Sequence, residues 1–375
     1  MSPSKEQLQR EILQEGEKIK TFYEWLESHM PPSFFEEVDH KNVLLIARSL
    51  IGFPLQNYFI QIHLKNEALS LCLDSPDADL KVLAQYQTRG IKNYRSFVSN
   101  APLPFPKAAC LRVATISFTT FSEEESAEEL FSAAQYKEIL KQLKERNHQV
   151  QESDLNELIQ QLNPRFLRSL TSERLVIALD MFFRAKTRDN CQYQEKYNED
   201  WKEKKEAPSL QLVFAWRHVP KCGFLYRLAK IIHRHKLAIK RVNAIYINAY
   251  GKQNILLMSI GLHGMNGKAA WEEANVTDFL QEFVTSKYFE GMESIESIFV
   301  DSGLVSGNLG NLIKAMIYFI HQALVHLDLN AYSLRHIEEG ICRHPELTCL
   351  LLDAFEQKFH PETHQIEAYL ENEKK

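Results

Sequence analysis

Alternating apolar and polar residues mark several short strands in the first third of the chain. The clearest is 111–121, where β-branched and aromatic residues alternate strictly with polar ones. The stretches 58–62 and 69–73 show the same period and predict two more strands. Helical spacing predicts helices over 41–50 and 77–87. Together these elements predict an α+β unit over residues 33–121.

A second region with mixed periodicity runs from residue 210 to 289. Its pattern predicts the order β-α-β-β-α, which lacks only a final strand to be ferredoxin-like. The apolar stretch 298–300 is the candidate for that strand. The expected elements are a strand at 210–216, a helix at 224–232, strands at 242–247 and 255–262, and a helix at 276–283.

Helices are expected in the rest of the chain. The polar amino-terminal helix over 5–30 should end at Pro31 and Pro32, which lack the backbone donor a helix needs. Residues 130–190 have helical spacing, with Thr171 or Ser172 as a cap. The carboxy-terminal part from about residue 303 is strongly apolar at helical spacing.

Two charged stretches separate these regions. The acidic run 122–129 is interpreted as a solvated linker that enters a helix, and the alternative is a site for a basic partner. The charged stretch 192–206 is interpreted as a linker or a hairpin tip.

We therefore predict an α+β fold with an ACT/ferredoxin-like β-α-β-β-α unit, a second amino-terminal α+β unit and flanking helical segments. The expected domains are an amino-terminal helix, an α+β and possibly ACT-like domain, a helical connector, an ACT-like domain and a helical segment, over 1–32, 33–121, 122–206, 207–300 and 301–375.

Composition narrows the functional classes. Over 375 residues the formal net charge is -5, with 44 basic and 49 acidic residues, so a nucleic-acid partner is not expected. The amino terminus lacks an apolar signal region, and the apolar run 315–327 is too short to cross a bilayer. We therefore expect no membrane partner. The six cysteines are scattered and form no C-x-x-C pair, which favours reduced thiols and a cytoplasmic location.

A search for catalytic or metal-binding groups yields no convergent set. The glycine-rich segments 261–268 and 303–310 lack the spacing of phosphate or dinucleotide loops. His233 and His235 lie two positions apart on a predicted helix and so point to different faces. We expect no catalytic centre, no metal site and no cofactor site in this chain.

One turn does suggest ligand chemistry. Val219, Pro220, Cys222, Gly223 and Phe224 lie where a strand passes into the amino terminus of a helix. Free backbone N–H groups at such a terminus can bind a carboxylate, and a glycine allows close approach. The turn is a candidate site for an amino acid or another small anion. A plain strand-to-helix turn is the alternative. A reactive Cys222 thiolate, which a helix amino terminus would stabilise, is a further hypothesis.

The same residues carry a resemblance to a known family. The stretches 214–229 and 241–250 resemble the ACT-like segment of the large NAD-dependent glutamate dehydrogenases. Residues 172–175 resemble the helical connector of that family. Further similarities lie at Tyr23, 30–35, 343–347 and 355–361, so the resemblance extends from about residue 20 to 362. Lys221 and Cys222 depart from the direct Pro-Gly step of many ACT turns.

The resemblance implies a regulatory and oligomerisation region that precedes a glutamate dehydrogenase catalytic domain. That domain carries the catalytic residues and the NAD site, so this chain alone is expected to be non-catalytic and to hold no cofactor. The implied partners are an amino-acid effector, a catalytic domain in cis or in trans, and further copies of the chain. Two alternatives stay open: a purely structural assembly module, and one piece of a split dehydrogenase.

Overall fold

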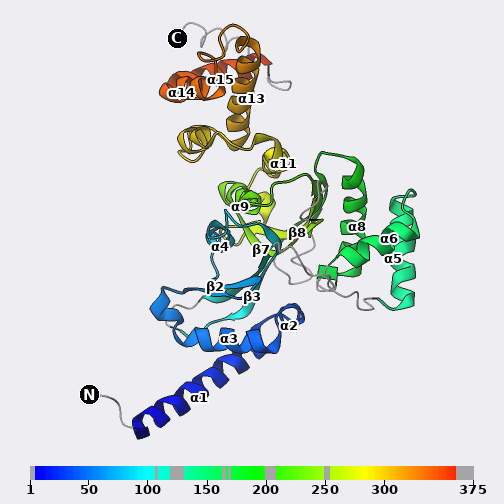
Figure 1. The fold of residues 1–375 in the computed structure, drawn as a ribbon, viewed down its shortest axis with the longest axis vertical. Helices are drawn as coiled ribbons and strands as arrows, with labels where there is room; N and C mark the ends of the chain where they lie inside the picture. The colour runs from blue at the N-terminus through cyan, green and yellow to red at the C-terminus, as the bar shows by residue number, and fades with distance from the viewer. Residues whose placement is uncertain are drawn as a thin grey trace. The chain divides into compact units, whose positions relative to one another are not determined.

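The computed structural model describes residues 5–105, 109–118, 131–162, 166–167, 170–198, 208–248 and 254–359. Over this part the protein contains one eight-stranded antiparallel sheet together with helices (Figure 1). The predicted α+β class is therefore confirmed. The acidic run 122–129 lies outside the described residues.

Three helices come first: α1 (Lys5–His29), α2 (Pro32–Glu37) and α3 (His40–Ile51). As predicted, α1 ends just before the two prolines, and Pro32 opens α2 at a position where a missing N–H costs nothing. The side chain of Asp39 caps α3, because its Oδ1 accepts a hydrogen bond from the backbone N of Asn42 at 2.7 Å.

The first half of the sheet consists of two hairpins joined by a helix. The short η1 (Phe53–Gln56) precedes them. The first hairpin is β1 (Phe59–His63) with β2 (Glu67–Leu73), the joining helix is α4 (Ala78–Ala84), and the second hairpin is β3 (Ile91–Pro102) with β4 (Cys110–Phe118).

The second half repeats this order. Its elements are α8 (Ser172–Thr187), β5 (Gln192–Tyr197), β6 (Leu210–Arg217), α9 (Phe224–Arg234), β7 (Leu237–Ile247) and β8 (Ile255–Gly264). Thr171 caps α8, as predicted, by accepting a hydrogen bond from the backbone N of Arg174.

The strand order is β1-β2-β4-β3-β7-β8-β6-β5. Counted outward from the centre, β3 corresponds to β7, β4 to β8, β2 to β6 and β1 to β5, so the two halves have the same order. The central pair is β3 with β7, in register from Asn93↔Ile245 to Ser96↔Val242. The chain thus contains two copies of one unit, related by an approximate two-fold axis through this central pair. We call the copies the first repeat (α3 to β4) and the second repeat (α8 to β8).

The two faces of the sheet carry different helices. Helices α4 and α9 contact each other on one face, where Tyr94 bonds to Asp79 of α4 and Trp216 packs on Phe224 of α9. The opposite face carries α1 and α3 over the first repeat and α8 over the second. Because residues along a strand alternate between faces, each strand supplies both layers.

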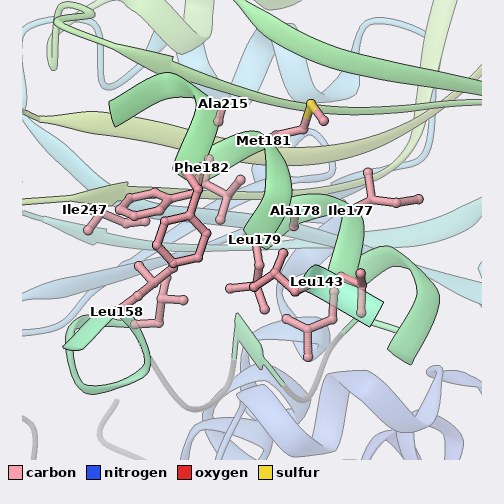
Figure 2. Close-up of a cluster of buried hydrophobic side chains, with 14 of the residues drawn as sticks. Leu143, Leu158, Ile177, Ala178, Leu179, Met181, Phe182, Ala215 and Ile247 are labelled. Atoms are coloured by element: carbon pink, nitrogen blue, oxygen red, sulfur yellow. The ribbon is translucent and has the colours of Figure 1, made fainter. Parts of the chain in front are cut away.

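The layer over the second repeat is an apolar cluster around α8. Helices α5 (Ala133–Arg146) and α6 (Glu152–Gln161) cover the side of α8 that faces away from the sheet. Figure 2 shows members of this cluster from the helices and the sheet, among them Leu143, Leu158, Leu179, Phe182, Ala215 and Ile247. Each fully buried large side chain of this kind stabilises the fold by roughly 1.5–3 kcal/mol.

The second predicted unit has the expected order, with β6, α9, β7 and β8 followed by α10 (Ala270–Glu273) and α11 (Val276–Thr285). The predicted strand at 298–300 is wrong, because these residues belong to the π-helix η3 (Glu296–Val300). The sheet position beside β6, where a final ferredoxin-like strand would lie, is taken by β5. The interpretation of 192–206 as a linker or hairpin tip is therefore wrong for 192–197, which form this strand, and 199–207 lie outside the described residues.

Residues 277–375 form a second compact unit. After α11, its described elements are η2 (Ser286–Phe289), α12 (Glu293–Ile295), η3, α13 (Gly307–Leu324), α14 (Leu334–Arg343) and α15 (Pro345–Phe359). Its core contains Ile295, Phe299, Ile313, Ile317 and Leu352. In the described part of the chain, no helix has both the length and the apolar character needed to span a membrane.

Candidate functional site

The turn singled out in the sequence joins β6 to α9. Gly223 is the amino-terminal cap residue of α9 with φ +72°, a conformation that favours glycine. No side chain of the described residues caps this helix. Val219 and Phe224 are buried, Pro220 and Gly223 are half-buried, and the Cys222 side chain is exposed.

Protein groups hold this turn from two sides. The Tyr246 hydroxyl donates to the carbonyl of Pro220 at 2.7 Å, and the side-chain amide of Asn254 donates to the carbonyl of Val219 at 2.9 Å. On the other side the turn lies against the first repeat, since a Cβ added to Gly223 would come within 3.6 Å of the Gln87 carbonyl oxygen. The backbone carbonyls of Val219 and Pro220 therefore accept hydrogen bonds from within the protein.

A larger candidate site is a cavity of about 700 Å³ that none of those turn residues lines. Both repeats contribute to it. Pro31 and Ser33 form a wall beside α2, and Leu170 and Arg174 form a wall at the start of α8. Strands β3, β6, β7 and β8 provide the floor, with Phe97, Gln211, Asn243, Ser259 and Gly261 among the lining residues.

The cavity forms where the two central strands diverge. Pairing of β3 with β7 stops at Ser96↔Val242, and both strands have an irregular register beyond that point. On the face that carries α1, α3 and α8, these helices cover the apolar cluster of the first repeat and that of the second. Among the described elements, no helix covers the strip of sheet between the two clusters. This geometry places a hollow with both polar and apolar lining residues at the junction of the repeats.

Polar side chains line the strip itself. Asn243 and Ser259 are opposite each other in the β7–β8 register and are both buried. Asn243 accepts a hydrogen bond from Nε of Arg95 at 2.9 Å, and Nη1 of Arg95 pairs with Glu37 of α2. That ion pair is shielded from solvent, so it anchors the α2 wall to the floor of the cavity.

Positive charge dominates the lining. Among the described lining residues, four carry a full cationic charge, namely Arg112, Arg174, Lys240 and Arg241, whereas Asp74 alone is acidic. Asp74 already bonds to Arg112, since its Oδ1 accepts from Nε at 2.9 Å and from Nη2 at 2.7 Å. The other charged groups of the described lining, Arg174, Lys240 and Arg241, are all cationic.

Two of these cations influence each other. The half-buried Arg174 donates from Nε to Oε1 of Gln211 at 3.1 Å. Burial lowers the pKa of Arg174, and the nearby Arg241 lowers it further, whereas Glu173 acts in the opposite direction. Burial also lowers the pKa of Arg241, against the influence of Glu36. An anion between the two guanidinium groups would relieve their repulsion.

Arg112, in contrast, has a structural role. It is 2% exposed and also donates to Asp79, to Ser96 Oγ at 3.0 Å and to the Ile239 carbonyl at 2.7 Å. Burial acts to lower its pKa, but Asp79 and Asp74 outweigh burial and raise it. The side chain thus joins β4 to β7 across the gap between the diverging strands.

Besides its cationic groups, the lining offers hydrogen-bonding serines and His263. It contains no cysteine among the described residues, and its one carboxylate is held by Arg112. In the described residues, no three His, Cys, Asp or Glu side chains gather as metal ligands would.

Sequence patterns did not reveal this site. Arg174 belongs to the predicted helical connector, and Lys240 and Arg241 flank a predicted strand, so they are far apart in sequence. One signal was available: consecutive basic residues inside a strand interrupt the apolar alternation that a buried sheet requires. The predicted turn belongs to the second repeat, whereas residues of both repeats line the cavity.

No known protein-family model matches the sequence, and no curated protein matches it significantly.

Proposed function

We propose that this chain is a regulatory module that binds a small carboxylate, such as an amino acid, in the cavity between its two repeats. The observation that carries the proposal is the pair Arg174 and Arg241, which both line a cavity that also contains polar side chains. Planar guanidinium groups bind carboxylates with two parallel hydrogen bonds. Because residues of both repeats line the cavity, an occupied cavity would favour one arrangement of the repeats over others.

The regulated enzyme, in this proposal, is an NAD-dependent glutamate dehydrogenase, attached to the chain or bound to it in the cytoplasm. The support is the resemblance of residues 214–229 and 241–250 to the ACT-like segment of that family. The Val219–Phe224 turn remains a second possible contact point for the effector. The effector would regulate the enzyme by binding one state of the module more tightly than the other, which favours that state.

Calorimetry and thermal unfolding of the purified chain test the binding step. A panel of amino acids and small carboxylates at millimolar concentration should raise the unfolding temperature and release or absorb measurable heat. Arg174→Gln should weaken binding about tenfold, which corresponds to the loss of one charge-assisted hydrogen bond. Arg48→Gln, which removes an exposed arginine of α3 outside the cavity, is the matched control. Absence of binding to the whole panel would refute the proposal.

A structural assembly role is the second candidate, and one observation favours it. The second compact unit exposes large apolar side chains on α13 and α15, including Phe319 at 73% and Leu351 at 65%. Exposed apolar surface of this kind often marks an interface. Light scattering should show an oligomer that Phe319→Lys converts to a smaller species, with no response to ligand.

A split enzyme is the last alternative. Glutamate-dependent formation of NADH by the purified chain alone would favour it over the regulatory proposal.

A further inference from the structure

The register of β7 contains an extra residue next to the cavity. Ile239 is opposite Leu262 and Arg241 is opposite Gly261, so two steps along β7 match one step along β8. Lys240 is the extra residue, which makes this a β-bulge. Neighbouring residues of a regular strand point to opposite faces, but a bulge re-aims one of them. Both Lys240 and Arg241 accordingly line the cavity.

The bulge places two cationic centres in the lining, the pair Arg174 and Arg241 and the single Lys240. Arg241 lies with Arg174 of α8 over the strip of β7, β8 and β6, where Gln211 orients the Arg174 guanidinium group. Lys240 provides a compact ammonium group from the bulge, and its side chain is exposed. The acidic groups nearby have other partners or act on the arginine centre: Asp74 bonds to Arg112, Glu173 pairs with Lys196 and also acts on Arg174, and Glu36 acts on Arg241.

We infer that the cavity selects small molecules with two anionic groups, one bound by Arg174 and Arg241 and the other by Lys240. The inference rests on the proposed function and adds the ligand class: a short dicarboxylate or an acidic amino acid rather than a neutral one. A compact dianion such as phosphate carries the same charge on one group, so it offers no second anionic group to Lys240.

Succinate and its monoamide, succinamate, have nearly the same shape but carry two carboxylates and one, respectively. Comparing their affinities therefore measures the effect of the second negative charge. In calorimetry at low ionic strength, succinate should bind about fivefold more tightly, the gain expected from one additional exposed ion pair. Lys240→Gln should abolish this preference and leave the affinity for succinamate unchanged. Raising the salt concentration should also reduce the preference, since exposed charges are screened.

Lys65→Gln is the matched control, because Lys65 is an exposed lysine outside the cavity. It should keep the wild-type preference for succinate. Equal affinity of the wild-type chain for succinate and succinamate would overturn the inference while leaving the proposed binding function intact. Phosphate that binds as tightly as succinate, with no effect of Lys240→Gln on either, would overturn the two-centre assignment. Failure of every anion to bind would instead refute the proposed function itself.

Discussion

The two repeats share a backbone plan but differ in what lies beneath their crossover helices. The β2–β4 register ends at Leu73↔Leu111, and one step before it Cys72 is opposite Arg112. The β6–β8 register ends at Arg217↔Ile255, and one step before it Trp216 is opposite Leu256. The first repeat thus fills this pair of positions with a thiol and a charge, whereas the second fills it with an aromatic ring and a leucine.

The residues around Arg112 and Trp216 complement the side chain in each repeat. Arg112 is neutralised by Asp74 and Asp79, and the Tyr94 hydroxyl donates to Asp79 Oδ1 at 2.6 Å. In the second repeat, the Trp216 ring packs on Phe224 with centroids 5.6 Å apart and planes at 72°. The comparison shows that topology and hairpin register define the repeat, whereas either ionic or apolar filling can support it.

Removing the charge from the first repeat should have the largest effect. Arg112→Met leaves the carboxylate of Asp79, which is 3% exposed, without its cation. Breaking a buried pair in this way costs about 3–5 kcal/mol of unfolding free energy. Denaturant titration measures the loss.

The double variant Arg112→Met with Asp79→Asn removes both charges and should recover part of that loss. If the double variant is as unstable as the single one, burial of an uncompensated charge is not the cause.

Shrinking the ring in the second repeat should have a smaller effect. Trp216→Phe loses the hydrogen bond from Nε1 to the Asp189 carbonyl at 3.1 Å and leaves a small cavity. The expected cost is about 2 kcal/mol. Trp271→Phe serves as control, because Trp271 is only half-buried, and it should cost less. Equal losses for the two tryptophans would contradict the apolar role of Trp216.

The next largest effect should be a loss of stability at alkaline pH that comes from Cys72 of the first repeat. Burial raises the pKa of the Cys72 thiol to about 12 from its ordinary value of 9.0, and Asp79 adds to the shift. The folded state therefore keeps a proton that the unfolded state releases above pH 9.0, and stability falls as the pH rises from there. The slope is at most about 1.4 kcal/mol per pH unit for one group.

Cys72→Ala removes this contribution. Its unfolding free energy should fall less between pH 8.5 and about pH 10 than that of the wild type, as followed by denaturant titration. Identical pH dependence of the two proteins would contradict the assignment to Cys72.

The strand-to-helix turns should give the smallest difference. Gly223 has φ +72°, whereas Asp77, the corresponding cap residue of α4, has φ -103°. Gly223→Ala should cost about 1 kcal/mol through backbone strain. Gly52→Ala is the control, since Gly52 has φ -92° and, within the described part of the chain, no atom within 4 Å of an added Cβ. A loss in thermal unfolding that is the same for both variants would exclude strain at Gly223.

Periodicity predicted some strands and not others for a physical reason. β2 and β4 were found because Leu69, Leu71 and Val113 alternate with small or polar residues. β3 was not found, although it is one of the two central strands. It carries Arg95, Ser96 and Ser99 in buried positions, where partners from other strands and from α2 satisfy them. A buried polar residue that is hydrogen-bonded by distant groups breaks the apolar pattern of a strand, so the sequence pattern there is that of a loop.

The sequence by itself determined the α+β class, the positions of most helices and strands, and the glycine turn that opens α9. These features depend on interactions within a few residues, such as side-chain periodicity, capping and the φ preference of glycine.

Only the tertiary structure decided that the two α+β units share one sheet and that Arg174, Lys240 and Arg241 face one cavity. Both features depend on the pairing of β3 with β7, whose partners are about 150 residues apart in sequence, and the cavity lining depends also on a one-residue bulge in β7. The hydrophobic pattern of a strand fixes which face is buried, but the pairing of two distant strands is decided only when those faces pack together in the folded state.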